Sequence, residues 1–582
     1  MIDPILARLE AHELVRRLRE EELTYLFKHA LVQDTVRASL LLQERKRLHR
    51  LVGESLETLY PKQRAELAPL LTQHFANAGD DEKTRVYATM AGDEATRMNA
   101  NAEALEQYTR ALDLAQRANA ADEIVQELFL KRGRVLEVKG DYPAAVENYD
   151  AMLRAAKERS SRVMEMAALI ARATAHSIPS VVYDEPRAQE LSDRALELAR
   201  ALNNPEAQAK ILWNLMLLHS RVGTNRKLAT AYGEQALEIA RAHNLRERLA
   251  YVLNDIAPLI TFHGQSERGK QYNLESRRMW RAMDNLPMLS SNFGYAVMIH
   301  LLLGEYDEAI AASEEGLKIS REIGNAWNEA FTQTWIGEAY IERGEFEKAF
   351  RVMRAAIALG ETVFPPTLVL TRSDLARLYT DCGQPERGVE LATLALQVAE
   401  QRFPAIRPAA ASALAHAYLA LGKTEAARDV LRDAPEAFQP EFNPFYAADL
   451  ALAQIELLLA EKEFARARVL CEDVLNHVHV NTMRQYEMEL LLKYAQLHLR
   501  SKELDAAEER IRQARWLAER MDARWSLLRV SALERALALA RGDAGAAHAH
   551  QATIAALREA IAARTPPELR AGFLERAGKY EY

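Results

Sequence analysis

Two pairs of histidines are the side chains in this sequence whose chemistry first suggests a metal. His477 and His479 are separated by one residue, as are His548 and His550. On a helix, residues three or four apart share a face, whereas residues two apart point in different directions. Zinc needs ligands that converge on one point. Since both pairs lie in segments with helical periodicity, we predict that neither binds a metal.

A fragment of a phosphate-binding loop is the second candidate for chemistry. Gly422, Lys423 and Thr424 match the end of the G-x-x-x-x-G-K-[ST] pattern, but Ala417 stands where the first glycine is needed. The tripeptide also falls in a tight turn between two helical segments, whereas the motif requires a strand before it and a helix after it. No complete copy of the pattern occurs in the chain. We therefore predict no nucleotide hydrolysis.

Other arrangements typical of enzymes are also missing from the sequence. We find no nucleophile beside a general base, no glycine-rich loop, and no paired carboxylates that the sequence places in one cleft. The two cysteines, Cys382 and Cys471, are expected to be small buried hydrophobic residues. We predict that the protein is not an enzyme and uses no cofactor and no metal. An enzyme with an unrecognised site is the alternative.

Composition narrows the possible partners. The chain has 582 residues, 75 basic against 83 acidic, for a net charge of −8. This charge gives no general attraction to nucleic acid or anionic membrane, and glutamates dilute the one basic run, Arg45 to Arg50. The N-terminus lacks a signal-peptide core, and the longest apolar stretch, around Tyr295 to Leu303, is interrupted by His300. We predict a cytoplasmic protein that binds neither nucleic acid nor membrane.

The residues that must position any site belong to a repeated helical hairpin. In the stretch from Trp335 to Ala356, apolar residues recur at helical spacing on both sides of a turn at Gly344. A small residue on the second helix marks the same place in each copy. The gaps between markers are 39 to 43 residues. The markers are Ala104, Ala145, Ala188, Ala229, Gly269, Ala309, Ala349, Gly388, Ala427, Ala467, Ala507 and Ala547.

This pattern resembles the tetratricopeptide repeat (TPR), whose large-Gly-Tyr…Ala…Phe…Ala series the stretch follows, with Ile336, Gly337 and Tyr340 on the first helix and Phe346, Ala349, Met353 and Ala356 on the second. The resemblance implies an all-α fold, a right-handed α-α superhelical solenoid of about twelve TPR-like hairpins. The period of about 40 residues exceeds the usual 34, so longer helices are expected. We predict the array over residues 81–564 and a short tail over 565–582.

The N-terminal region, residues 1–80, differs from the array. Helices are expected near residues 6–15, 29–42, 44–60 and 63–78, with a β-hairpin between Val15–Leu18 and Leu23–Phe27. The run LTYLFKHALVQDTVRASLLLQERKRLHRLVGESLE and the segments after it resemble the join between winged helix and TPR arm in bacterial STAND-class and cyclase–AAA–TPR signalling ATPases. Residues 1–40 would then be a winged-helix remnant that has lost part of its cover. Self-association through this region is one expected consequence.

The same resemblance points to a ligand-binding groove. In TPR proteins, a stripe about a third of a turn from the packing face of each first helix lines the concave surface. In this chain that stripe is polar across the central repeats. The residues predicted to line the groove are Asn214, Arg221, Asn254, Thr261, Thr334, Glu338 and Arg377. We expect the side chains of Asn214, Asn254, Thr334 and Arg377 to be free rather than packed; ordinary solvated surface without a dedicated partner is the alternative.

The function that this sequence implies is binding. We predict a non-catalytic scaffold or sensor arm of a bacterial signal-transduction system that holds a peptide or protein partner in the groove. The alternative is a sensor for a small-molecule effector that regulates an ATPase, a cyclase or a transcription activator. Neither the ligand, nor the oligomeric state, nor whether the chain is part of a longer ATPase follows from the sequence.

Overall fold

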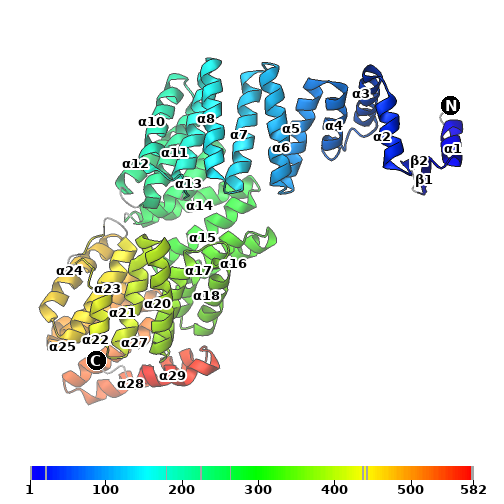
Figure 1. Ribbon diagram of the computed structural model, residues 1–582. Coiled ribbons are helices and arrows are strands. Elements are labelled where there is room, and N and C mark those ends of the chain that lie inside the picture. Colours follow the sequence, from blue (N-terminus) through cyan, green and yellow to red (C-terminus); the bar gives the residue numbers. More distant parts are fainter. Residues whose placement is uncertain are drawn as a thin grey trace. The chain divides into compact units, whose positions relative to one another are not determined.

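A computed structural model describes residues 3–19, 23–178, 180–222, 226–262, 264–435, 438–440 and 444–578. Within these residues the chain forms 29 α-helices, one short 3-10 helix and one two-stranded sheet (Figure 1). Contacts divide the chain into two compact units, Met1–Asn204 and Pro205–Tyr582. The predicted boundaries at residues 80 and 564 stay predictions, since this division falls elsewhere. The all-α solenoid is confirmed.

Unit 1 begins with the predicted hairpin. Strands β1 and β2 pair antiparallel with Val15 opposite Phe27 and Arg19 opposite Leu23. Helices then follow in antiparallel pairs. The elements are α1 (Asp3–Ala11), β1 (Val15–Arg19), β2 (Leu23–Phe27), α2 (Ala30–Ser39), α3 (Leu42–Leu59), α4 (Ala68–Ala78), α5 (Asp81–Arg97), α6 (Asn101–Arg117), α7 (Asp122–Val138), α8 (Tyr142–Glu158), α9 (Arg162–Ser177) and α10 (Glu185–Ala201).

Glycines on the first helices explain how the two helices of a hairpin approach each other in unit 1. A Cβ atom at Gly133 would lie 2.3 Å from the Tyr149 ring, and one at Gly92 would lie 2.6 Å from Tyr108. Both distances are far below van der Waals contact, so only glycine leaves room for the tyrosine. The glycine of the first helix and the tyrosine of the second helix are therefore one packing device.

Unit 2 continues the array from α11 onward. Odd-numbered helices from α5 to α27 are the first helices of their hairpins, and even-numbered ones are the second helices. The elements of unit 2 are α11 (Pro205–Val222), α12 (Arg226–Ala242), α13 (Arg246–Phe262), α14 (Ser266–Ala282), α15 (Leu286–Leu303), α16 (Tyr306–Glu322), α17 (Ala326–Glu342), α18 (Phe346–Gly360), α19 (Thr367–Asp381), α20 (Pro385–Arg402), η1 (Pro404–Ile406), α21 (Arg407–Ala420), α22 (Thr424–Val430), α23 (Pro444–Glu461), α24 (Phe464–Val480), α25 (Arg484–Arg500), α26 (Leu504–Arg520), α27 (Arg524–Ala540), α28 (Ala544–Ala562) and α29 (Pro567–Gly578).

The predicted packing face is confirmed. All twelve marker residues lie on second helices, α6 to α28, and all are buried. Ala349, for example, has no exposed surface. The small residue that repeats in the sequence therefore marks the contact between each second helix and its own first helix.

Helices five hairpins apart also meet in unit 2, which the sequence did not indicate. Helix α15 contacts α25, α17 contacts α27, and α19 contacts α29. Two glycines with positive φ sit at these contacts: a Cβ at Gly344 would lie 2.7 Å from Ile561, and one at Gly383 would lie 2.6 Å from the Gly572 carbonyl oxygen. Unit 2 therefore closes one superhelical turn against the next, and we call these contacts the ring closure.

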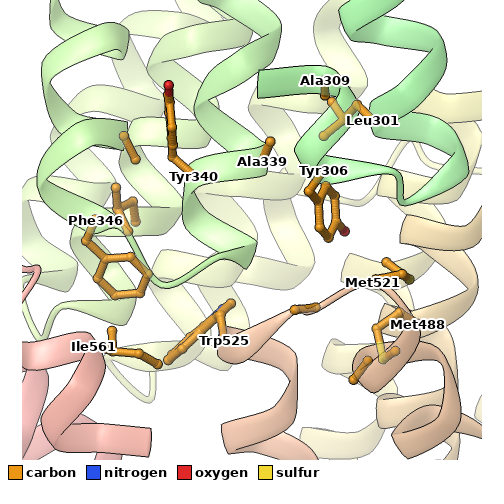
Figure 2. Close-up of a cluster of buried hydrophobic side chains, with 14 of the residues drawn as sticks. Leu301, Tyr306, Ala309, Ala339, Tyr340, Phe346, Met488, Met521, Trp525 and Ile561 are labelled. Atoms are coloured by element: carbon orange, nitrogen blue, oxygen red, sulfur yellow. The ribbon is translucent and has the colours of Figure 1, made fainter. Parts of the chain in front are cut away.

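The ring closure has an apolar core of its own (Figure 2). The Phe346 ring lies 5.5 Å from Trp525 and 5.4 Å from Phe573, centroid to centroid. Tyr306 and Met521 belong to the same buried cluster. Phe573 lies on α29, so the segment expected to be a short tail is a helix that packs into this core.

Helix α15 is the one helix among the described residues that is long and apolar enough to cross a membrane by length and composition. Two thirds of its length, 67%, is buried inside the protein. Its apolar side chains, such as Val297 and Leu301, pack in the core of unit 2. The apolar composition of α15 is thus explained by its burial in the core of unit 2.

Candidate functional site

Unit 2 encloses an interior cavity of about 130 Å³. Its lining comes from the first helices of seven consecutive hairpins, α13 to α25, so the cavity lies where the inner faces of the ring converge. We call it the central cavity. The lining residues are Phe262, Met298, Thr334, Trp335, Glu338, Leu370, Asp374, Ala409, Phe445, Tyr446, Asp449 and Tyr486.

Three carboxylates face this cavity, and each has a different partner. The Asp449 carboxylate accepts a 3.3 Å hydrogen bond from the Arg377 guanidinium, which also donates to Ser412 at 2.9 Å. The Glu338 carboxylate accepts from the Gln485 amide. Asp374 makes no hydrogen bond to any residue that the structure describes, and it interacts with its charged neighbours only through space.

The charges around the cavity are out of balance. Burial raises the pKa of Glu338 to about 7. Burial, and then the charge of Glu338, raises the pKa of Asp374 well above its usual value. Burial also raises the pKa of Asp449, although Arg377 opposes this effect. The positive charge of one guanidinium therefore faces three carboxyl groups. These carboxyl groups retain protons at pH values at which they would lose them in water.

Charged groups farther along the inner face are better matched. Glu342, 8% exposed, accepts a 2.6 Å hydrogen bond from Ser526 and lies 3.4 Å from Arg529. These contacts join α17 to α27 across the ring closure. His416 lies between Glu456 and Asp381, 3.1 and 3.4 Å away. Burial lowers the pKa of His416 but the two carboxylates outweigh burial and raise it to about 9, so this histidine carries a charge.

The structure places the predicted groove residues in three different settings. Thr334 and Glu338 line the central cavity, and Arg377 contacts Asp449 beside it. Asn254 and Thr261 are buried between helices. Asn254 accepts from the Asn292 amide at 3.1 Å, and Thr261 donates to the Ala257 carbonyl at 2.8 Å. Asn214 is half-buried on α11, and the Arg221 side chain lies outside the described residues.

The expectation of free side chains in an open track is wrong for three of the four residues concerned. Asn254 has no exposed surface, Thr334 is 2% exposed, and Arg377 donates to Asp449 and Ser412. Asn254 is buried because it packs against the next hairpin and accepts from Asn292 on α15, whereas Thr334 lines the cavity where the first helices meet. Ligand binding by these residues stays a prediction. The site at which we expect it is now a small cavity and no longer an open groove.

Four residues that line the central cavity were not among the predicted groove residues: Asp374, Asp449, Tyr446 and Tyr486. A signal for one of them was present: Asp449 is the single charged residue between Pro444 and Gln454 in an otherwise apolar run. A lone carboxylate in such a run is either paired or functional. The others could not have been found, since their convergence depends on which hairpins face one another.

A larger depression of about 750 Å³ lies over α24, α25 and α26, where Trp516 is 55% exposed. Several of its charged side chains are paired with one another, for example Arg484 with Glu487 and Arg512 with Glu509. Its charges therefore leave no clear excess of either sign. We regard the central cavity as the candidate site, because its charges are unbalanced and its walls come from the whole ring.

Within the described ranges no group of three or more His, Cys, Asp or Glu side chains is arranged to hold a metal. Cys382 and Cys471 are both buried, and burial raises the pKa of each thiol. Fold and site together define a TPR-type helical solenoid with a small cavity that is lined by aromatic side chains and three carboxylates.

Residues 374–560 match the family model for the MalT-like TPR region. The matched segment includes Asp374, Arg377, Asp449 and Tyr486 of the site. None of the curated protein sequences matches the chain.

Solved structures with a similar fold include three repeat proteins. The APC/C hetero-tetramer Cut9–Hcn1 is 15% identical over 94% of this chain and 99% of that one, with a TM-score of 0.45. A STAND signal transduction ATPase with a tetratricopeptide repeat sensor, from Pyrococcus horikoshii, is 15% identical over 80% of this chain and 60% of that one, with a TM-score of 0.39. NprR in complex with its cognate peptide NprX is 14% identical over 58% of this chain and 98% of that one, with a TM-score of 0.42.

Proposed function

We propose that this chain is a non-catalytic, protein-binding arm of a bacterial cytoplasmic signal-transduction system. The match to a TPR region supports a binding role. The observation that carries the proposal is an apolar stripe along α3, most of which the described residues of unit 1 leave exposed. Leu41, the residue before α3, and Leu51, Val52 and Leu59 are exposed, and Leu48 between them is half-buried.

The stripe is exposed although its residues are large and apolar. Leu41 is 80% exposed, Leu59 69% and Val52 41%. Another face of α3 packs on α4, where a Cβ at Gly53 would lie 2.7 Å from the Phe75 ring. Helix α4 therefore covers only part of α3. Exposed apolar surface of this kind marks a protein interaction site in a soluble protein.

The spacing of the stripe favours an amphipathic helix as its occupant. Positions 41, 48, 52 and 59 follow steps of seven, four and seven, which is the spacing of a helix seam. Such a seam receives a helix whose own apolar residues recur at three and four. We therefore propose that α3 binds an amphipathic helix of a protein partner. Self-association through the N-terminal region remains the competing outcome.

The test compares two double variants of the full chain. Val52→Asp with Leu59→Asp places charges in the stripe, and Val480→Asp with Leu539→Asp places them at similarly exposed residues of unit 2, 65% and 53% exposed. We expect the stripe variant to lose a partner captured from source cells by roughly ten-fold or more, and the control variant to retain it. Equal capture by both variants would contradict the proposal. Conversion of a dimer to a monomer in light scattering would instead identify the occupant as a second copy.

The central cavity favours a second candidate function, a sensor for a small-molecule effector. Residues from seven first helices line it, so an occupant would contact the whole ring at once and alter the ring closure. Hydrogen exchange of α17 and α27 amides tests this idea with a small-molecule extract of source cells. Protection that disappears when the extract is dialysed is the expected result. Unchanged exchange with a concentrated extract would contradict it.

A further inference from the structure

We propose that the central cavity binds a small organic cation, an ammonium compound of about the size of choline. This inference rests on the second function proposed above and names the chemistry of its effector. Three properties of the cavity support it: the charge of its carboxylates, the aromatic side chains of its walls, and its volume.

The charge of the cavity leaves a place for a cation. Counting every charged group that faces the carboxylates, α17 supplies Glu338, α19 supplies Asp374 and Arg377, and α23 supplies Asp449. Arg226 of α12 is a further cation. Its guanidinium lies 5.3 Å from the centroid of the Phe262 ring, and its charge acts on Tyr446. The carboxylates still outnumber the guanidinium groups.

Among these carboxylates, Asp374 is the one that a ligand would meet. Arg377 already bonds to Asp449, and the Gln485 amide bonds to Glu338. Asp374 has no hydrogen-bond donor among the described residues, yet it lines the cavity. Hydroxyl groups of Tyr446 and Tyr486 are close enough for the carboxylates to raise their pKa further above that of free tyrosine. A bound cation would complete the set of charges.

The walls of the cavity suit an alkylated ammonium better than a hydrated metal ion. Five aromatic residues line it: Phe262, Trp335, Phe445, Tyr446 and Tyr486. Phe262 meets Phe445 edge to face, with ring centroids 4.2 Å apart, and Phe445 meets Tyr486 at 5.7 Å. Aromatic cages of this kind bind quaternary ammonium groups through the negative faces of the rings. A metal ion would need a shell of oxygen ligands instead.

The volume sets the size of the ligand. A cavity of about 150 Å³ in another protein holds one benzene molecule, and the central cavity measures about 130 Å³. A ligand of roughly six or seven non-hydrogen atoms therefore fits.

Binding of a cation in the cavity should release protons. Near neutral pH the crowded carboxylates hold protons because burial and mutual repulsion disfavour their charged forms. A fixed positive charge reverses that preference, so binding releases protons. A neutral ligand of the same shape would release none.

The experiment is calorimetry on the full chain at pH 7 with choline, and with 3,3-dimethyl-1-butanol as its neutral isostere. Each titration is run in phosphate and in HEPES, whose ionisation enthalpies differ. We expect choline to bind roughly ten-fold or more tightly than the isostere, since a buried cation–aromatic contact is worth this much. We also expect its apparent enthalpy to differ between the buffers. No binding of choline, trimethylammonium or tetramethylammonium would overturn the proposal, as would equal binding of the isostere.

Variants separate a binding role from a structural one. Asp374→Asn and Glu338→Gln should each weaken choline binding by roughly ten-fold or more. Because each removes an unbalanced buried charge, neither should lower the melting temperature. Glu508→Gln, at an exposed position on α26, is the matched control and should bind choline normally. Normal binding by both cavity variants would overturn the proposal. If the extract alters hydrogen exchange while no ammonium compound binds, the effector-sensor function survives and only its ligand class fails.

Discussion

Glu342 provides a direct test of whether the ring closure stores an unfavourable charge. Its carboxylate is 8% exposed and joins α17 to Ser526 and Arg529 on α27. Burial raises its pKa from 4.5 to about 7, even though Arg529 acts in the opposite direction. We expect Glu342→Gln to remove this cost while leaving an oxygen that accepts the hydrogen bond from Ser526.

The sign of the effect follows from proton linkage. Between pH 4.5 and about 7 the folded protein keeps the Glu342 proton that the unfolded chain has lost, so this group's contribution to stability falls as the pH rises. A pKa rise from 4.5 to about 7 corresponds to about 3 kcal/mol at about 1.4 kcal/mol per unit. Most of this, about 2 kcal/mol, is lost between about pH 5 and 8. The variant should lack that part of the pH dependence.

Hydrogen exchange of α17 and α27 amides at pH 5 and 8 measures this difference, after correction for intrinsic exchange rates. Glu315→Gln, at an exposed position on α16, is the control and should behave like the original chain. At pH 8 the Glu342→Gln variant should be protected more strongly than the original chain. If original chain and variant lose protection equally between pH 5 and 8, the charge at Glu342 does not weaken the ring closure and our reasoning is wrong.

Three further predictions concern the packing and charge of unit 2. His416→Gln should lower the free energy of unfolding by about 2 kcal/mol at pH 6 and by progressively less as the pH rises through about 9. The reason is that a histidine with a raised pKa stabilises the fold only while its ring is charged. Equal unfolding free energies of the original chain and the variant at pH 6 would contradict this. Gly383→Ala should release α29 and speed its amide exchange, since the new Cβ meets the Gly572 carbonyl at 2.6 Å. Gly422→Ala, with a similar positive φ and no atom within 4 Å, imposes the same backbone strain without that contact and should leave α29 protected. Ala349→Leu should overpack a fully buried helix contact and cost about 1–3 kcal/mol, with faster exchange spreading to the neighbouring hairpins; native exchange there would mean that the packing face is misplaced.

The sequence by itself determined the hairpins and the face on which each one packs. A small residue recurs at every contact between the two helices because a larger one would collide, as the 2.3 Å distance from a Cβ at Gly133 to Tyr149 shows. That constraint is local and repeats along the chain, so a single sequence reveals it. The N-terminal strand pair was also predictable, because its alternation lies within a few residues.

Tertiary structure alone decided what the inner faces of the hairpins do. Small angles between successive hairpins add up over five repeats, and their sum places α25 against α15 and α27 against α17. No short stretch of sequence encodes that sum. Asp374 and Asp449, 75 residues apart, share one cavity for this reason. Asn254, which we predicted to be free in the groove, is buried because its side chain bonds to Asn292 of the next hairpin. The sequence supplied the polar side chains, and the closure of the ring determined which of them meet.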